Sequence, residues 1–201
     1  MKDIKQEVIY KIEHESGCPL CSLILDFEFQ LLSKLQLDVS NDENVRNRIA
    51  RKGGFCDFHF RQFKKITNGK TRIVFLKAIL DQESYKKEAF KIDCSLCKNI
   101  ENYEKELIEN ILRILDDEQT LKIFEVSNGI CFDHLQKVES IIDNERLKKN
   151  LHAINIKQLD RLKEDFDYMN KIDSYYEIDH SKRNLINALI QKLTGRKSGG
   201  L

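Results

Sequence analysis

Cysteine and histidine recur in one pattern that is written twice along this chain, and no other feature constrains the fold as strongly. The first copy contains Cys18-x-x-Cys21 and, 34 intervening residues later, Cys56-x-x-His59. The second copy contains Cys94-x-x-Cys97 and, 33 intervening residues later, Cys131-x-x-His134. Together the copies use all six cysteines. Three thiolates and one imidazole are the ligand set of a closed tetrahedral zinc site, so the sequence predicts two metal-binding modules.

The two copies align beyond these ligands. A glycine stands two residues before Cys56 and before Cys131, and a leucine lies between the two cysteines of each Cys-x-x-Cys motif. The offset between the copies is 76 residues at the first half-motif and 75 at the second. This period is longer than that of common solenoid repeats, so we expect two modules and not a repeat array.

Apolar residues recur at helical spacing along most of the chain, which has only one proline and eight glycines. We therefore predict an all-α fold with two tandem Cys3His metal-binding helical modules and a C-terminal pair of long helices. The predicted domains are residues 1–92 for the first module with a connecting helix from 71 to 91, residues 93–143 for the second module, residues 144–195 for the helical pair and residues 196–201 for a disordered tail.

Several residues predict where helices begin and end. Pro19 suits the first turn of a helix, and Ser40 with Glu43 could form a capping box for a short helix through Ile49. The pairs Gly53-Gly54 and Asn128-Gly129 should each end a helix directly before a Cys-x-x-His motif. Gly195 should close the last helix, and a break near residues 173–174 should separate the C-terminal pair. Both kinds of half-motif then stand at helix starts, where backbone N–H groups favour thiolates.

The predicted cofactor is two Zn²⁺ ions per chain, with an iron–sulfur cluster as the alternative. Three disulfides are a further alternative, which a reducing compartment disfavours. Spacing cannot prove which half-motifs share an ion, but pairing within each module closes the shorter loops and is the prediction. The other histidines, His14, His152 and His180, are expected to be surface or capping residues, with His14 a weaker alternative ligand.

Charge is distributed unevenly, although the net charge is only +1. Between residues 46 and 77, ten basic residues face one acid, whereas residues 93–145 contain thirteen acids and five bases. This contrast indicates nucleic-acid binding by the basic stretch, charge pairing between modules or chains, or two unrelated solvated faces. The basic residues proposed for nucleic acid are Arg46, Arg48, Arg51, Lys52, Arg61, Lys64 and Lys65.

The chain shows no apolar run of bilayer length and no signal-peptide pattern, so we expect a cytoplasmic protein that does not span a membrane. It contains no phosphate-binding glycine loop and no nucleophile–base motif. Four protein ligands on each ion leave no open position for substrate, so no enzymatic activity is expected.

The predicted function is a zinc-stabilised binding or regulatory scaffold, most simply for a protein partner or a second copy of the chain. The alternatives are nucleic-acid binding and a redox or metal sensor.

The chain also resembles a bacterial and archaeal family of unknown function. The resemblance is carried by Cys18-Pro19-Leu20-Cys21, by Gly54-Phe55-Cys56-x-x-His59 and by the second Cys-x-x-Cys with its Gly-x-Cys-x-x-His. The strings Phe166-Asp167-Tyr168 and Leu193-Thr194-Gly195 extend it to the C-terminal part. The second copy departs from the first, with Ser95 in the place of Pro19 and Ile130 in the place of Phe55. The resemblance implies a duplicated metal motif and no catalytic residue.

Overall fold

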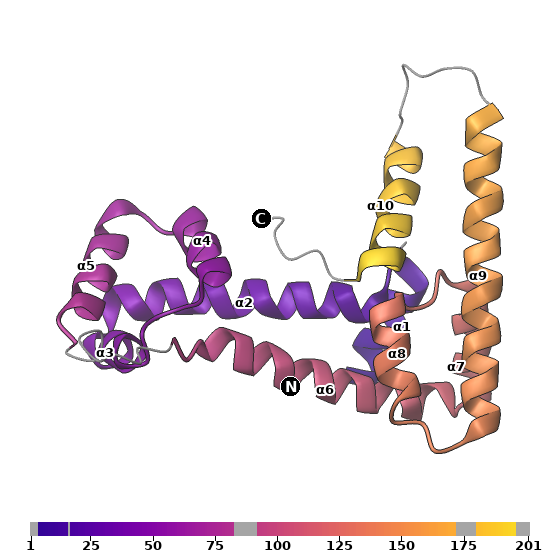
Figure 1. The fold of residues 1–201 in the computed structure, drawn as a ribbon, viewed down its shortest axis with the longest axis horizontal. Helices are drawn as coiled ribbons and strands as arrows, with labels where there is room; N and C mark the ends of the chain where they lie inside the picture. The colour runs from indigo at the N-terminus through magenta and orange to yellow at the C-terminus, as the bar shows by residue number, and fades with distance from the viewer. Residues whose placement is uncertain (1–3, 16, 83–91, 172–179, 196–201) are drawn as a thin grey trace. The chain divides into compact units, whose positions relative to one another are not determined.

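The computed structural model describes residues 4–15, 17–82, 92–171 and 180–195. Within these ranges every regular element is an α-helix, which confirms the predicted fold class. Figure 1 shows the helices in chain order: α1 (Ile4–His14), α2 (Pro19–Asn41), α3 (Glu43–Arg51), α4 (Asp57–Ile66), α5 (Gly69–Leu80), α6 (Ser95–Leu115), α7 (Glu118–Val126), α8 (Phe132–Glu139), α9 (Glu145–Lys171) and α10 (His180–Thr194).

The described part of the chain forms two compact units. Unit 1 combines two separate ranges, the described residues up to 25 and those from 104 to 195, whereas unit 2 consists of the described residues between 26 and 103. The predicted domains, residues 1–92, 93–143 and 144–195, were each continuous along the chain, whereas unit 1 joins an N-terminal range to a C-terminal one. The predicted tail at 196–201 and the predicted break near 173–174 lie outside the described residues.

Unit 1 contains α1, α7, α8, α9, α10, the start of α2 and the larger part of α6. Helix α7 packs against α1 and α9, and α10 packs against α8 and α9, where Figure 1 shows α9 and α10 side by side. The core of the unit is mainly aliphatic, and its fully buried side chains include Val8, Leu107, Ile111, Phe124 and Leu151. Burying these side chains is the main favourable term in the folding of the unit.

Unit 2 contains most of α2, the start of α6, and α3, α4 and α5, of which α3 packs against α5. Its core is built on three rings, because the centroids of Phe55, Phe63 and Phe75 lie 5.3–5.4 Å apart. Phe27 and Tyr103, which occupy equivalent positions in the two copies, stack on each other with centroids 4.1 Å apart. The two copies therefore correspond at this stacked aromatic pair as well as at the ligands.

The helix ends follow most of the sequence signals. Helix α2 begins at Pro19, and glycines 53, 54, 129 and 195 have φ angles of 82°, 82°, 66° and 71° in the left-handed region. The predicted capping box is wrong, because Ser40 lies inside α2 and its Oγ donates to the carbonyl of Gln36. Asp42 caps α3 instead, and its carboxylate accepts from the N–H groups of Asn44 and Val45. The connecting helix extends from 69 to 80, and residues 83–91 lie outside the described part of the chain.

Candidate metal centres

Each half-motif lies at the start of a helix, as predicted. Cys18, Cys56, Cys94 and Cys131 each stand directly before the first residue of α2, α4, α6 and α8. The second ligand of each motif is then the third residue of its helix. One helix start thus presents two ligands on one side, and the positive end of the helix dipole stabilises the thiolate form. The same local geometry occurs four times in the chain.

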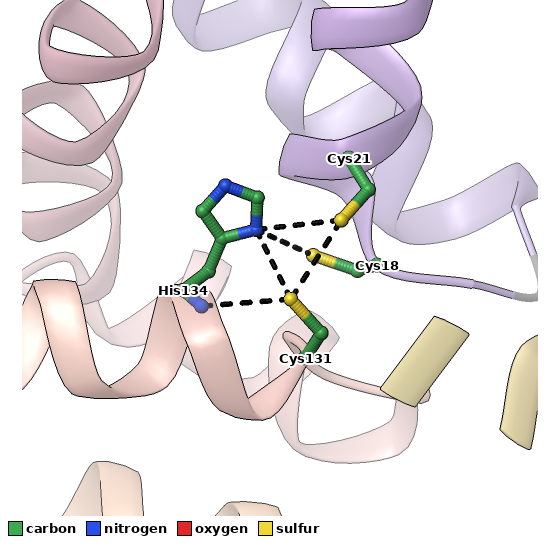
Figure 2. A group of neighbouring side chains, drawn as sticks. All are labelled: Cys18, Cys21, Cys131 and His134. Atoms are coloured by element: carbon green, nitrogen blue, oxygen red, sulfur yellow. Dashed lines mark hydrogen bonds between the residues drawn. The ribbon is translucent and has the colours of Figure 1, made fainter. Parts of the chain in front are cut away.

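The first group of four ligands, which we call centre A, consists of Cys18, Cys21, Cys131 and His134. Figure 2 shows the three sulfur atoms converging on Nδ1 of the histidine, with two cysteines at the start of α2 and the other two ligands at the start of α8. The Nδ1–Sγ distances are 3.4 Å to Cys18, 3.4 Å to Cys21 and 3.2 Å to Cys131. The sulfur atoms of Cys21 and Cys131 are 3.6 Å apart, and all four residues are buried.

The second group, which we call centre B, consists of Cys56, His59, Cys94 and Cys97. Nδ1 of His59 lies 3.2 Å, 3.5 Å and 3.4 Å from the sulfur atoms of Cys56, Cys94 and Cys97. The sulfur atoms of Cys56 and Cys97 are 3.6 Å apart. These two cysteines are only partly buried, whereas His59 and Cys94 are buried. Centre B therefore has the same ligand geometry as centre A and greater solvent access.

The predicted pairing within each copy is wrong. Each centre joins the Cys-x-x-Cys motif of one copy to the Cys-x-x-His motif of the other. The physical reason is the 23-residue helix α2 that follows Cys18, because a helix of this length carries the chain about 35 Å along its axis. The entropy of closing a loop rises only slowly with its length, so the longer loop between Cys21 and Cys131 adds little cost.

Both groups have the size and chemistry of a single-ion site. For a tetrahedral zinc ion, the usual bond lengths place two sulfur ligands about 3.8 Å apart and a sulfur and a nitrogen ligand about 3.6 Å apart. The observed separations of 3.2–3.6 Å are close to these values. All six cysteines are free, and no disulfide joins them. Each group could therefore hold one metal ion.

A carboxylate lies beside the far nitrogen of each histidine, a feature that the ligand motifs alone do not predict. Nε2 of His134 donates to Glu104 at 3.1 Å. Nε2 of His59 lies 3.4 Å from Glu28 but makes no hydrogen bond among the described groups. Such a partner fixes the ring orientation and leaves Nδ1 as the acceptor that a metal ion requires. The signal was present in the sequence, because Glu28 and Glu104 are separated by the 76-residue offset of the first half-motif.

One turn after each histidine, the copies differ. Lys137 stands three residues after His134, and its Nζ donates to Glu104 and to Asp133, both at 2.8 Å. The equivalent residue in the first copy is Gln62, which is 4% exposed and whose Oε1 is unsatisfied among the described groups. The carboxylates of Glu104 and Asp133 and the ring of His134 also lie close enough to hold an ion. The ammonium group of Lys137 already takes the cation position between the two carboxylates.

The ionisable groups of the centres are strongly coupled. Burial lowers the pKa of His59, but interactions with Cys94, Glu28 and Cys56 outweigh it and raise this pKa to about 10. In centre A, hydrogen bonds from Cys18 and Cys21 lower the pKa of Cys131, and the bond with Cys131 raises the pKa of Cys21. The hydrogen bond from His134 lowers the pKa of Glu104 to about 2. Because neighbouring ligands shift one another's pKa, protonation and metal binding at each ligand set are linked.

The other candidate residues lie apart from the two centres. Nδ1 of His14 donates to the carbonyl of Tyr10 at 2.9 Å, and His152 pairs with Glu139 at 3.0 Å. His14 is therefore no ligand of either centre. The side chain of His180 lies outside the described residues. Most of the basic residues proposed for nucleic acid are exposed, namely Arg48, Arg51, Lys52, Arg61, Lys64 and Lys65, whereas Arg46 is half-buried and donates to the carbonyl of Val39.

Taken together, the fold and the centres define an all-α protein with two Cys3His groups that could each hold a metal ion. Comparison with known proteins adds nothing further, because no family model, no curated protein and no solved structure matches the chain. Across the described residues, none of the helices is both long enough and apolar enough to cross a membrane.

Proposed function

We propose that both centres hold structural zinc and that the protein is a zinc-stabilised scaffold that binds or regulates another macromolecule. The observation that carries this proposal is the completeness of the ligand sets. Six cysteines and two histidines form two groups of four, and a carboxylate lies at Nε2 of each histidine. Four protein ligands close the coordination shell of zinc, which suits stabilisation and leaves no position for a substrate.

The close packing of the ligand atoms supports a single ion over an iron–sulfur cluster. Sulfur atoms 3.6 Å apart leave room for one metal ion between them but not for a cage of several iron and sulfide ions. Metal analysis of the purified protein tests this directly. We expect two zinc ions per chain and a colourless protein. One ion per chain, or a brown protein with visible absorption, would contradict the proposal.

A specific observation favours nucleic-acid binding as the second candidate function. Arg48 and Lys52 of the basic stretch line a pocket of about 240 Å³ together with Lys34 of α2. The same pocket contains Ser95, Asn99 and the single acid Asp38, so its charged lining is predominantly positive. A phosphate backbone is the ligand that such a surface attracts most strongly, in a salt-dependent manner.

Titration of labelled DNA and RNA at low salt tests this second function. We expect affinity that falls steeply with salt and that is lost in the double variant Arg48→Glu with Lys52→Glu, which reverses two positive charges of this pocket. The matched control is Lys157→Glu, which changes the charge of an exposed lysine on α9 in the other unit. Absence of binding at micromolar protein removes nucleic acid from the candidates and leaves a protein partner.

A further inference from the structure

Helix α10 covers centre A through two neighbouring residues near its end. Oε1 of Gln191 accepts the backbone N–H of the ligand Cys18 at 2.8 Å. Nζ of Lys192 donates to the carbonyl of Asn128 at 3.0 Å, three residues before the ligand Cys131. Both ligand loops of centre A are therefore held by the same helix.

Lys192 is a buried cation whose hydrogen-bond partners are neutral. Its side chain belongs to a residue that is only 3% exposed. Besides Asn128, its Nζ donates to Oδ1 of Asn155 at 2.7 Å and to Oε1 of Gln158 at 3.5 Å. A buried ammonium that has only neutral partners requires an opposite charge nearby to offset its loss of hydration.

Centre A supplies that charge. Three thiolates and one divalent ion together carry one net negative charge. Burial lowers the pKa of Lys192 to about 8, while the charges of Cys18 and Cys131 act in the opposite direction and favour the ammonium form. Both cysteines are ligands of centre A, and their loops bond to α10 through the N–H of Cys18 and the carbonyl of Asn128.

Two glycines show how closely the C-terminal helices approach the ligand loops. A Cβ atom at Gly17 would overlap Oε1 of Gln191, and a Cβ atom at Gly129 would overlap Oε1 of Gln158. Gly17 immediately precedes the ligand Cys18, and Gly129 stands two residues before the ligand Cys131. The backbone beside the ligands is therefore shaped to receive side chains from α10 and α9.

We propose that Lys192 is the counter-charge of metal-loaded centre A and that α10 is a latch whose docking depends on the ion. This inference rests on the proposal that centre A holds zinc. When the ion leaves, protons from solvent bind the thiolates, which neutralises the negative charge that Lys192 faces and frees the loop that Gln191 holds, so α10 separates. By thermodynamic linkage, docking of α10 must in turn tighten the binding of zinc by the same factor.

The first experiment uses the unaltered full-length protein. Zinc is removed by a graded series of chelator concentrations, and alkylation of Cys18 and Cys131, mapped by peptide mass, reports when centre A is empty. Hydrogen exchange of residues 180–194 is measured in the same samples. We expect protection of α10 to fall together with emptying of centre A. Protection that persists after these cysteines become reactive overturns the proposal.

The second experiment removes the charge. We expect Lys192→Met to lower the zinc affinity of centre A roughly ten-fold, within the usual range of coupling between sites. The matched control, Lys157→Met, makes the same change at an exposed position on α9 and should leave the affinity unchanged. Gln191→Ala keeps the charge, removes one contact and should have a smaller effect. Equal chelator resistance of Lys192→Met and its control overturns the proposal. If Lys192→Met does not fold, the first experiment decides alone.

The two experiments separate this inference from the proposed function. A protein that is purified without zinc contradicts the proposed function, and the latch fails with it. A protein that contains two zinc ions but shows no coupling of α10 to centre A contradicts the latch alone.

Discussion

Centres A and B share one ligand set and one local geometry but lie in different surroundings. In centre A all four ligands are buried, whereas Cys56 and Cys97 of centre B are partly exposed. Two lysines, Lys137 and Lys192, lie around centre A, while the position equivalent to Lys137 beside centre B is the buried Gln62. The two centres have the same ligand types and differ in the residues that surround them. The comparison indicates that centre A is the more protected centre and centre B the more reactive one.

The largest expected effect comes from removing one ligand. Cys21→Ser should empty centre A and Cys97→Ser should empty centre B, each lowering the free energy of unfolding by about 4 kcal/mol or more and Tm by roughly 10 °C. Hydrogen exchange should locate the loss in unit 1 for the first variant and in unit 2 for the second. Asn99→Ser, at an exposed position of α6, is the control. A variant that melts within about 2 °C of the parent would show that its centre does not stabilise the fold.

The next effect concerns the carboxylates behind the histidines. Glu104→Gln should weaken zinc at centre A, and Glu28→Gln should weaken zinc at centre B, each by about 10- to 100-fold. The reason is that a carboxylate raises the basicity of the ring and fixes its orientation. Competition with a chelator measures both, and Glu101→Gln, at an exposed position of α6, is the control. Affinities equal to that of the control would show that these two glutamates do not contribute to metal binding.

Thiol reactivity should distinguish the centres by a factor of roughly ten in rate. In the zinc-loaded protein, Cys56 and Cys97 should react with a small alkylating reagent before Cys18 and Cys21, because only the first pair is partly exposed. Timed alkylation followed by peptide mass analysis measures this order. Equal rates would remove the basis for calling centre B the more reactive centre, and the reverse order would invert the comparison.

The smallest expected effect is a pH dependence at centre A. The pKa of Glu104 is lowered from 4.5 to about 2, first by its hydrogen bond with His134 and then by Lys137. A lowered pKa in the folded state means that this carboxylate stabilises the protein fully above pH 4.5 and loses that contribution as the pH falls toward 2. The difference in unfolding free energy between the parent and Glu104→Gln should therefore shrink from pH 6 to pH 3. A constant difference would contradict this assignment.

The ligands and the helical class could be predicted from the sequence because both depend on local patterns. The spacing of Cys18 and Cys21 places two ligands at one helix start, and this holds in any tertiary arrangement. The pairing could not be predicted, because it depends on where the 23-residue helix α2 carries the chain. Glu28 and Glu104 could have been found by extending the repeat alignment. Lys192 could not, because it lies in the unduplicated C-terminal part and reaches centre A only through the packing of α10.

Along the chain, the four ligands of centre B lie between the two halves of centre A. This order matters during protein synthesis. Centre B is complete once Cys97 has left the ribosome, whereas Cys18 and Cys21, made first, must wait for Cys131 and His134. At typical translation rates the second event follows the first by roughly 2 to 7 seconds. In that interval the ligands nearest to Cys18 and Cys21 along the nascent chain are Cys56 and His59, which belong to centre B. Early formation of the 23-residue helix α2 would separate the two motifs during this interval.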